Sequence, residues 1–342
     1  MSANRGRKYG RSDLDMNGFS VTEAPRCGGG GPGRGRAGRR ARSGGGRILF
    51  RPLAGRQAHW DCGRQLHRTV ARRINIGAMP DTSPLYVASD VHGHYDALVA
   101  ALRERGLVDE ESRWTGGDAR LWILGDLFDR GEEGVAVVRL LRALAGPAAA
   151  EGGLVDTLIG NHEVLVLGSR RFGDVAFTDV DGQDRQFLHW WVLNGGFEDE
   201  LGDLTEDEVS WLESRRAVHV EGRSLLVHAD TESYLGYGRT EESVNAAIRA
   251  IMSSDEPEEW WQLFRELTRR HEFMGAEGPA RVRSMLRSFG GEEIVHGHST
   301  IPDTTELTPG EVTEARRYCE GLALNVDGGV YQGGKCLVIR ID

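Results

Sequence analysis

Short apolar runs alternate with amphipathic segments along the chain from residue 85 onward. The run 85–89 is typical of a buried strand, and the apolar residues of 94–105 share one face, which predicts a helix. Two more strands are expected at 121–124 and 155–159, with a helix between them that ends at Gly146-Pro147. Strands that alternate with helices in this way predict a parallel sheet.

The second half of the chain continues the alternation, without an internal repeat. Its strands are interleaved with helices, which predicts an α/β fold throughout. The expected elements are strands at 224–227, 293–295, 322–326 and 335–341, and helices at 240–252, 257–270 and 279–289.

Polar residues able to bind metal ions stand where the predicted strands end. The carboxyl ends of parallel strands gather at one edge of a sheet, which is where α/β proteins place their functional groups. We therefore expect these side chains to converge on one site. They are Asp90, His92, Asp126, Asn161, His228 and His298.

This set of residues suits two divalent ions. Asp90 and His92 are two residues apart, so both side chains can point the same way toward one ion. Asp126 has two carboxylate oxygens and is the natural bridge between ions roughly 3.5–4 Å apart. Asn161, His228 and His298 complete the second ion.

The charges and the donor types refine this metal prediction. Two divalent ions bring +4 and the two carboxylates bring −2, which leaves positive charge for a bridging hydroxide and an anionic phosphate. Mixed imidazole, amide and carboxylate donors suit Mn²⁺, Fe or Zn²⁺ better than Mg²⁺ or Ca²⁺, with Mn²⁺ as the expected ion. The sequence thus predicts a site that attracts phosphate.

Three more residues have side chains suited to phosphate chemistry. Arg130 follows Asp126 by four residues and has the planar donor fork that holds phosphate oxygens. His162, next to Asn161, can protonate a leaving oxygen, and Asp129 could orient it. We predict that Arg130, Asn161 and His162 contact the substrate.

Five successive segments of the chain carry a family resemblance. Together they look like the signatures of calcineurin-like metallophosphoesterases, and the GDxxDRG form resembles the phosphoprotein phosphatase branch, which includes serine/threonine phosphatases and symmetrical dinucleoside-tetraphosphatases. The resemblance covers residues 85–342 and ends in a closing hairpin at 325–331. The segments are DVHGH at 90–94, GDLFDRG at 125–131, GNHE at 160–163, VHA at 227–229 and VHGH at 295–298.

This resemblance implies a fold, a set of ligands and a mechanism. The fold would be a sandwich of two mixed β-sheets flanked by helices, with the six strand-end residues as metal ligands. It implies His162 as the proton donor, Asp129 as its partner and Arg130 as the phosphate clamp. Metal-bound hydroxide would attack phosphorus in line. The chain departs from the family pattern at Asp230, which adds negative charge, and at Thr300, where other branches have a second histidine.

Several substrates are compatible with these motifs. A serine/threonine protein phosphatase-like enzyme acting on phosphomonoesters is the first expectation, and a dinucleoside polyphosphate (Ap4A-type) hydrolase is the alternative. A cyclic-nucleotide phosphodiesterase is disfavoured by Thr300, and a non-catalytic phosphate-binding scaffold by the complete ligand set. The expected partner is therefore a phosphorylated protein or nucleotide.

The charge distribution divides the chain in two. Residues 1–80 hold 17 Arg or Lys against 4 Asp or Glu, whereas the rest holds 25 against 48. We interpret 1–82 as a disordered Gly/Arg-rich tail, with a start at Met79 as a hypothesis, and 83–342 as the phosphoesterase domain. The acidic domain opposes nucleic-acid binding, which would rest on the tail alone.

The cysteines and the hydropathy bear on location. Four scattered cysteines without CxxC spacing favour a reducing cytoplasm over a disulfide framework. No stretch approaches the ~20 apolar residues of a membrane span, so no membrane partner is expected. The sequence does not determine an oligomeric state.

Several other aromatic and polar residues have open roles. His94 and His296 could contact ligands or substrate. The pairs Trp190-Trp191 and Trp260-Trp261 are expected in the core, with stacking on a nucleobase as the alternative. Residues interpreted as structural are His189, His219 and His271.

Overall fold

The computed structural model describes residues 83–341. The predictions for 1–82, namely the tail and the start at Met79, lie outside the described residues.

The first predicted strands form a four-stranded sheet with the order β11-β1-β2-β3. Two of its three pairings follow the prediction, because β1, β2 and β3 are parallel, while β11 joins β1 antiparallel. The strands are β1 (Leu85–Ala88), β2 (Arg120–Ile123), β3 (Leu154–Thr157) and β11 (Ile339–Ile341).

The second half of the chain forms a five-stranded sheet with the order β6-β7-β8-β10-β9. β7, β8 and β10 are parallel, and the two edge strands are antiparallel to their neighbours, so this sheet is mixed as well. Its strands are β6 (Val218–Glu221), β7 (Ser224–Val227), β8 (Glu293–His296), β9 (Arg316–Tyr318) and β10 (Ala323–Asn325), and a separate hairpin pairs β4 (Phe177–Thr178) with β5 (Asp184–Arg185).

The two sheets face each other across a shared apolar layer. Trp122 from β2, Leu226 from β7 and Val295 from β8 are fully buried in one cluster that draws on both sheets. Interleaved side chains from two inner faces are what hold a β-sandwich together. The structure therefore confirms the predicted sandwich of two mixed sheets.

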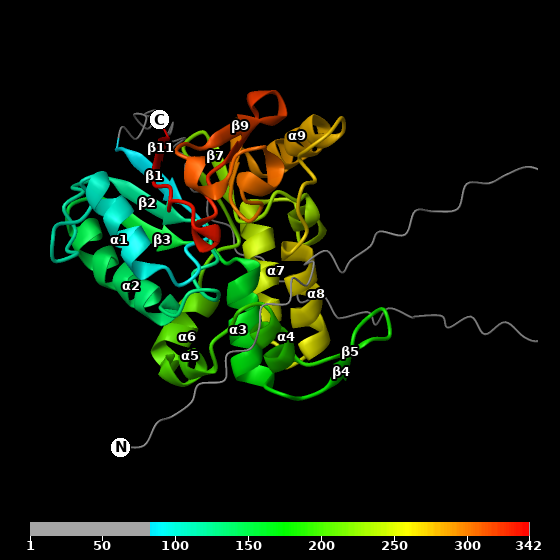
Figure 1. The fold of residues 1–342 in the computed structure, drawn as a ribbon. Coiled ribbons are helices and arrows are strands. Elements are labelled where there is room, and N and C mark those ends of the chain that lie inside the picture. Colours follow the sequence, from blue (N-terminus) through cyan, green and yellow to red (C-terminus); the bar gives the residue numbers. More distant parts are fainter. Residues whose placement is uncertain (1–82, 342) are drawn as a thin grey trace, which may run out of the picture. The chain divides into compact units, whose positions relative to one another are not determined.

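Helices cover the outer faces of the sandwich (Figure 1). α1 and α2 lie over the four-stranded sheet, α9 lies beside the five-stranded sheet, and α3, α4, α7 and α8 pack together. The helices are α1 (Tyr95–Glu104), α2 (Gly134–Ala150), α3 (Asn161–Phe172), α4 (Phe187–Leu193), α5 (Glu198–Asp203), α6 (Glu206–Glu213), α7 (Glu241–Met252), α8 (Pro257–Leu267) and α9 (Gly278–Phe289).

Several predicted element ends were wrong, and α8, for example, ends at Leu267 instead of 270. Two other differences are larger. α2 does not end at Gly146-Pro147 but continues to Ala150, since buried Ala148 gives the last turn a core contact that offsets the proline. The closing strand predicted at 335–341 is shorter, and only Ile339–Ile341 pairs with β1. Neither difference affects the strand ends that form the site.

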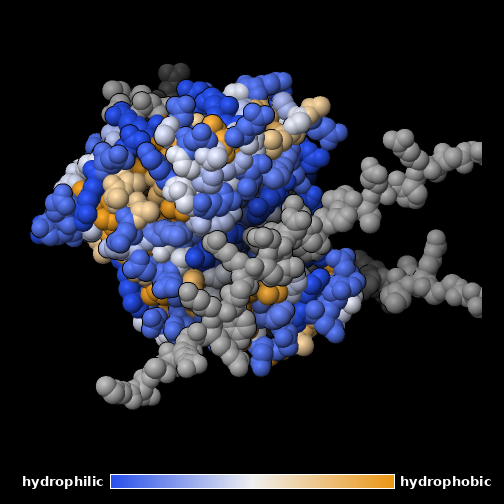
Figure 2. Space-filling model, in the orientation of Figure 1, coloured by the Kyte–Doolittle hydropathy of each residue, from blue (hydrophilic) through white to orange (hydrophobic). Residues whose placement is uncertain are grey.

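Large apolar side chains are mostly inside. On the face drawn in Figure 2, hydrophilic residues predominate and hydrophobic ones form small separate patches. No helix among the described residues is long and apolar enough to cross a membrane. The large apolar residues that do remain exposed are Val175, Val180, Val192, Leu193 and Leu307.

Candidate metal centre

The ends of five strands bring the predicted ligands together. Asp90 and His92 follow β1, Asp126 follows β2, and Asn161 opens α3 directly after β3. His228 follows β7 and His298 follows β8 on the second sheet. All six are buried, with at most 5% of their surface exposed. The structure thus gathers all six predicted side chains, three motifs from one sheet and two from the other.

Glycines let these loops approach one another closely. A Cβ at Gly160 would lie 2.2 Å from Asp126 Oδ1, and one at Gly297 would lie 2.1 Å from Asp90 Oδ2. Both distances are far below van der Waals contact, so only glycine fits. The glycines of the GNHE and GHS segments are therefore required by the convergence of the ligands.

The ligand loops also adopt unusual backbone angles. Ten non-glycine residues among those described have a positive φ, and six of them belong to the site. Side chains rarely adopt this left-handed region because the Cβ crowds the backbone, at a cost of roughly 1–2 kcal/mol per residue. The site residues concerned are Asp90 (53°), His92 (47°), Asp126 (55°), Asp129 (71°), Arg130 (68°) and His298 (67°).

One group of ligand atoms surrounds His228. Its Nδ1 lies 2.9 Å from the Leu124 carbonyl oxygen, which can only accept, so this nitrogen carries the proton. Its Nε2 then presents a lone pair to Asn161 Oδ1 at 2.9 Å and to His298 Nδ1 at 3.1 Å. His298 Nε2 lies 3.0 Å from the Thr268 carbonyl oxygen, so by the same argument Nε2 carries the proton and Nδ1 has the lone pair. Acceptor atoms therefore face one another.

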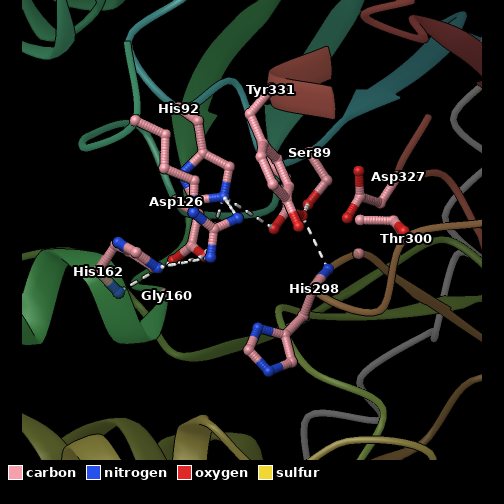
Figure 3. A network of polar contacts seen from close by, with 12 residues as sticks. Ser89, His92, Asp126, Gly160, His162, His298, Thr300, Asp327 and Tyr331 are labelled. Carbon is pink, nitrogen blue, oxygen red and sulfur yellow. Dashed lines mark hydrogen bonds and ion pairs between the residues drawn. The ribbon is translucent and has the colours of Figure 1, made fainter. Parts of the chain in front are cut away.

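A second group surrounds His92. Its Nδ1 donates to the Phe128 carbonyl at 2.8 Å, which leaves the Nε2 lone pair free. That Nε2 is 3.8 Å from Asp90 Oδ1 and 3.7 Å from Asp126 Oδ2, again acceptor against acceptor (Figure 3). Arg130 Nη1 lies 3.0 Å from the same nitrogen, so a cationic donor already approaches it.

Asp126 joins the two groups. Its Oδ2 faces His92 Nε2, while its Oδ1 lies 3.4 Å from His228 Nε2. The Asp90 carboxylate also lies near both groups. One oxygen faces His92 Nε2, and the carboxylate is within 4.8 Å of the ligand atoms of His228 and His298. One carboxylate with an oxygen toward each group is the geometry that a bridging ligand needs.

The chemistry of this donor set fits a pair of cations. Burial holds the pKa values of His92 and His298 well below the usual range, and the neighbouring Arg130 and Arg270, respectively, lower them further. Neutral imidazoles with free lone pairs are the form that binds metal. Facing acceptors buried away from water repel unless a cation lies between them. The centre is therefore suited to two divalent ions.

His162 and Asp129 form a buried pair beside this cluster. His162 Nδ1 lies 2.5 Å from Asp129 Oδ2, and its Nε2 lies 3.9 Å from Asp126 Oδ2 and 3.4 Å from Arg130 Nη2. Burial raises the pKa of Asp129 well above its usual range. Burial has the opposite effect on His162, because it lowers the pKa of the imidazole well below the usual range, and the nearby Arg130 lowers it further. The pairing predicted from the sequence is present in the structure.

Comparison with known families agrees with this geometry. The family of calcineurin-like phosphoesterases matches residues 83–302, more than half of the chain. The chain belongs to this family. It is accordingly a metallophosphoesterase, a hydrolase of phosphoric ester or anhydride bonds, and it contains clusters of buried Asp and His residues that could hold divalent metal ions.

The relatives of this phosphoesterase include protein phosphatases and dinucleoside tetraphosphatases. Shewanella-like protein phosphatase 2 of Arabidopsis thaliana is 36% identical over 113 residues, which are 32% of this chain but only 28% of the relative. The symmetrical bis(5'-nucleosyl)-tetraphosphatase of Methylococcus capsulatus is 27% identical over 75% of this chain and 91% of its own length. Both groups match the branch that the motifs resemble.

One solved structure has the same fold. A cold-active protein tyrosine phosphatase superposes with a TM-score of 0.57 at 22% identity, over 76% of this phosphoesterase and 74% of that chain. At this identity the likeness establishes the architecture alone. It agrees with the sandwich described above.

Arg270 is a site residue of the phosphoesterase that sequence reasoning missed. Its Nη2 lies 3.1 Å from His298 Nε2, whereas Arg130 contacts His92 and His162. It follows α8 and belongs to no motif. The only signal was the basic run Arg269-Arg270-His271 between two motifs, which is an ordinary pattern at the end of a helix.

Glu163 was given no individual role, and Trp191 was expected in the core or stacked on a nucleobase, without a contact to Asp129. Glu163 accepts hydrogen bonds from the backbone N–H groups of Asp126, Leu127 and Gly160 at 2.7–2.8 Å, and burial raises its pKa to about 6. Trp191 Nε1 donates to Asp129 Oδ1 at 2.6 Å. Both side chains hold the loops that carry the predicted site residues.

The closing turn adds two more groups. Tyr331 lies with its ring 3.9 Å from the Arg130 guanidinium carbon, and against the edge of His92. Asp327 is buried, with Oδ1 accepting from the Gly329 N–H at 2.9 Å and with no hydrogen-bond partner for Oδ2 among the described residues. Burial and the nearby Asp90 raise its pKa well above the usual range. Figure 3 shows both residues beside the cluster.

The residues with open roles are mostly structural. His296 is buried between the Gly297 carbonyl and the Tyr318 hydroxyl. Asp230 accepts from Ser299 Oγ at 2.6 Å and from the His271 N–H at 2.9 Å, so it braces two loops. His94 precedes α1, and its Nε2 has no partner among the described residues.

The two tryptophan pairs lie in the core, as expected. Trp191, Trp260 and Trp261 are at most 1% exposed, which argues against stacking on a nucleobase. Trp190 is only partly buried and packs against Trp261. Trp191 nevertheless reaches the site through its indole nitrogen.

Proposed function

We propose that this chain hydrolyses phosphomonoesters, in the first place those of phosphorylated serine or threonine side chains, with two divalent ions. The observation that carries the proposal is the convergence of two acceptor groups on Asp126, with Arg130 beside His92 and Arg270 beside His298. A dianionic phosphate is the substrate whose charge and oxygens suit such a centre.

The proposed ligands divide as the two acceptor groups divide. Asp90 and His92 would hold one ion, Asn161, His228 and His298 the other, and Asp126 both. When bound, the ions supply positive charge that polarises the phosphate and lowers the pKa of water toward ~7, which makes hydroxide available.

The remaining residues act on the substrate directly. Arg130 would bind phosphate oxygens with its planar fork, held flat against Tyr331. Arg270 would bind them next to His298. To act as the acid, His162 must carry a proton on both ring nitrogens, with Nδ1 donating to Asp129 Oδ2. Nε2 would then pass its proton to the leaving oxygen as water forms the new bond to phosphorus and the P–O bond to the leaving group breaks.

The metal and the location are finer points of the proposal. Mn²⁺ is our first choice because the donors mix imidazole, amide and carboxylate groups, with Fe or Zn²⁺ as alternatives. Metal analysis of the protein purified without added metal, followed by reconstitution with each ion, tests this choice.

The cytoplasm stays the predicted compartment on the pattern of the cysteines alone.

Hydrolysis of dinucleoside polyphosphates is the second candidate. It is supported by the Methylococcus capsulatus tetraphosphatase, which the alignment covers over 91% of its length, whereas the plant phosphatase is covered over 28%. The two candidates require the same centre and differ in what flanks it.

A parallel assay separates these candidates. The full chain with Mn²⁺ is given a phosphoserine peptide, diadenosine tetraphosphate, a cyclic nucleotide and an aryl phosphate, and kcat/KM is compared. The proposal expects the highest value for the phosphopeptide. A higher value for the tetraphosphate favours the second candidate, and turnover of none of the four rejects both.

Arg270 tests the phosphate-binding part of the proposal, and its neighbour Arg269 is the matched control. Arg270→Gln should raise KM or lower kcat/KM roughly 10–100-fold, since a hydrogen bond to a charged group contributes about 1.5–3 kcal/mol. Its neighbour Arg269 pairs with Glu272 and is about half exposed, so Arg269→Gln should change kcat/KM less than about twofold. Equal effects of the two substitutions would remove Arg270 from the proposal.

A further inference from the structure

The Asp129 carboxylate is held by one partner on each oxygen. Oδ2 faces His162 Nδ1 at 2.5 Å, and Oδ1 accepts from Trp191 Nε1 at 2.6 Å. An indole nitrogen can only donate, so its contact fixes which oxygen is left for the histidine. Asp129 is fully buried, and water does not compete for either oxygen.

The indole ring is itself immobile. Trp191 has no exposed surface, and a Cβ at Gly196 would lie 2.2 Å from its ring, so the backbone after α4 lies directly against the indole. The same segment holds the neighbour of Asp129, because the Arg130 N–H donates to the Gly195 carbonyl at 2.8 Å. One short element therefore holds two consecutive residues in left-handed backbone.

Trp261 shows that filling core volume does not by itself account for the hydrogen bond made by the Trp191 indole nitrogen. Trp261 belongs to the same hydrophobic core cluster as Trp191, packs against Phe187 and is only 1% exposed. Its indole nitrogen has no hydrogen-bond partner among the described residues. Two buried indoles thus fill the same core, and only one points its donor at the site.

We infer that Trp191 is a positioning residue for proton delivery. Its indole N–H fixes the Asp129 carboxylate so that Oδ2 holds His162 with Nε2 toward the leaving oxygen. The inference rests on the proposed function, since it concerns the same reaction. Trp191 touches no substrate and acts through Asp129 alone.

The test uses leaving groups of different quality. Proton donation matters for phenyl phosphate, whose leaving group is poor, and little for 2,4-dinitrophenyl phosphate, whose leaving group is good. Trp191→Phe should lower kcat for phenyl phosphate roughly 10–100-fold, with KM and the dinitrophenyl rate within about twofold. Trp261→Phe removes the same volume and should not change the ratio of the two rates.

A double-mutant cycle shows whether Trp191 acts through Asp129. In an Asp129→Ala background, Trp191→Phe should produce no further change in the ratio of the two rates, because the contact is already lost. Equal losses on both substrates, an unchanged phenyl phosphate rate, or additive effects in the cycle would each overturn the inference.

A measurement without turnover covers the case in which Trp191→Phe does not fold. In ¹⁵N-labelled full-length protein, Asp129→Ala should shift one indole N–H resonance upfield, while the Trp261 resonance, assigned with Trp261→Phe, stays in place. If no indole resonance moves, the contact is absent and the inference fails. If the contact is present but the wild type hydrolyses neither aryl phosphate, the proposed function fails instead.

Discussion

The N-termini of α3 and α6 carry the same kind of signal and use it differently. Each helix has a glutamate three residues after the residue that precedes it, Glu163 after Gly160 and Glu208 after Thr205. At α6 the motif is closed on itself, since Thr205 Oγ1 accepts from the Glu208 N–H at 3.2 Å and Glu208 Oε2 accepts from the Thr205 N–H at 2.8 Å. This is a complete capping box.

At α3 only one of the two hydrogen bonds of a capping box is present, from the Gly160 N–H to Glu163. Gly160 has no side chain to accept a helix N–H, and Asp126 Oδ1 accepts from the His162 N–H at 3.0 Å instead. Glu163 accepts from Gly160 but also from Asp126 and Leu127 of the neighbouring loop. The α3 terminus thus binds the loop that carries the bridging carboxylate. The same local device stabilises one helix at α6 and assembles a site at α3.

The two glutamates differ in charge environment accordingly. Burial raises the pKa of Glu163 to about 6, with three N–H donors only partly compensating. For Glu208, burial is outweighed by the hydrogen bonds from Arg139 and Thr205, which lower its pKa to about 2. Glu208 is paired with Arg139, whereas Glu163 has no cationic partner within 83–341.

The largest expected effect comes from Asp126→Asn. An asparagine oxygen can still accept from the His162 N–H, so the cap of α3 is retained while the bridging charge is lost. We expect kcat/KM to fall roughly a thousandfold or more and Mn²⁺ affinity to fall with it, with little loss of stability. Isothermal titration with Mn²⁺ and kcat/KM measure the two effects.

A matched control for this substitution lies outside the site. Asp181 in the β4–β5 hairpin pairs with Arg265 and is 57% exposed, so Asp181→Asn should leave both quantities unchanged. Full metal affinity in Asp126→Asn would refute the bridging role.

Glu163→Gln has the next largest expected effect. The amide NH₂ would face backbone N–H donors, which should cost about 2–3 kcal/mol of unfolding free energy and roughly 5–10 °C in Tm. Because the Asp126 loop is released, kcat should fall as well. Glu208→Gln should cost only about 1 kcal/mol and leave kcat unchanged, since its bonds stay within α6 and Arg139. Similar kcat values for the two variants would contradict the claim that Glu163, unlike Glu208, supports the site.

The smallest effect is a dependence of stability on pH at α6. The pKa of Glu208 is about 2 when folded, below its value of about 4.3 in an unfolded chain. Its contribution is therefore complete above about pH 5 and is lost as the pH falls toward 2. Urea unfolding of the wild type and Glu208→Gln should show a stability difference that shrinks over this range. A difference that stays constant with pH would contradict the lowered pKa.

The strand ends were predictable because their chemistry is local in sequence. Asp90, Asp126 and His228 each follow an apolar run, and the fold class followed from the same runs. α3 was not predicted, since its Val164-Leu165-Val166-Leu167 run is buried on all sides and has no helical period.

Arg270 and Trp191 were out of reach of this reasoning for a different cause. Arg270 reaches His298 only because α8 packs against α3, and Trp191 reaches Asp129 only through the short α4. These contacts join residues that are 28 and 62 positions apart and depend on packing between helices. Patterns within a segment carry no information on such contacts.

The left-handed backbone of the ligand loops has a consequence for mutational scanning. Asparagine and glycine enter this region readily, whereas alanine adds backbone strain. An alanine scan at Asp90, Asp126 or Asp129 would therefore report lost conformation together with lost chemistry, with φ values of 53°, 55° and 71°. Asparagine keeps the shape and the backbone preference and removes only the charge. A scan of this enzyme should accordingly pair each alanine with an asparagine, and the difference between the two measures how much of each loop is held by its own side chain.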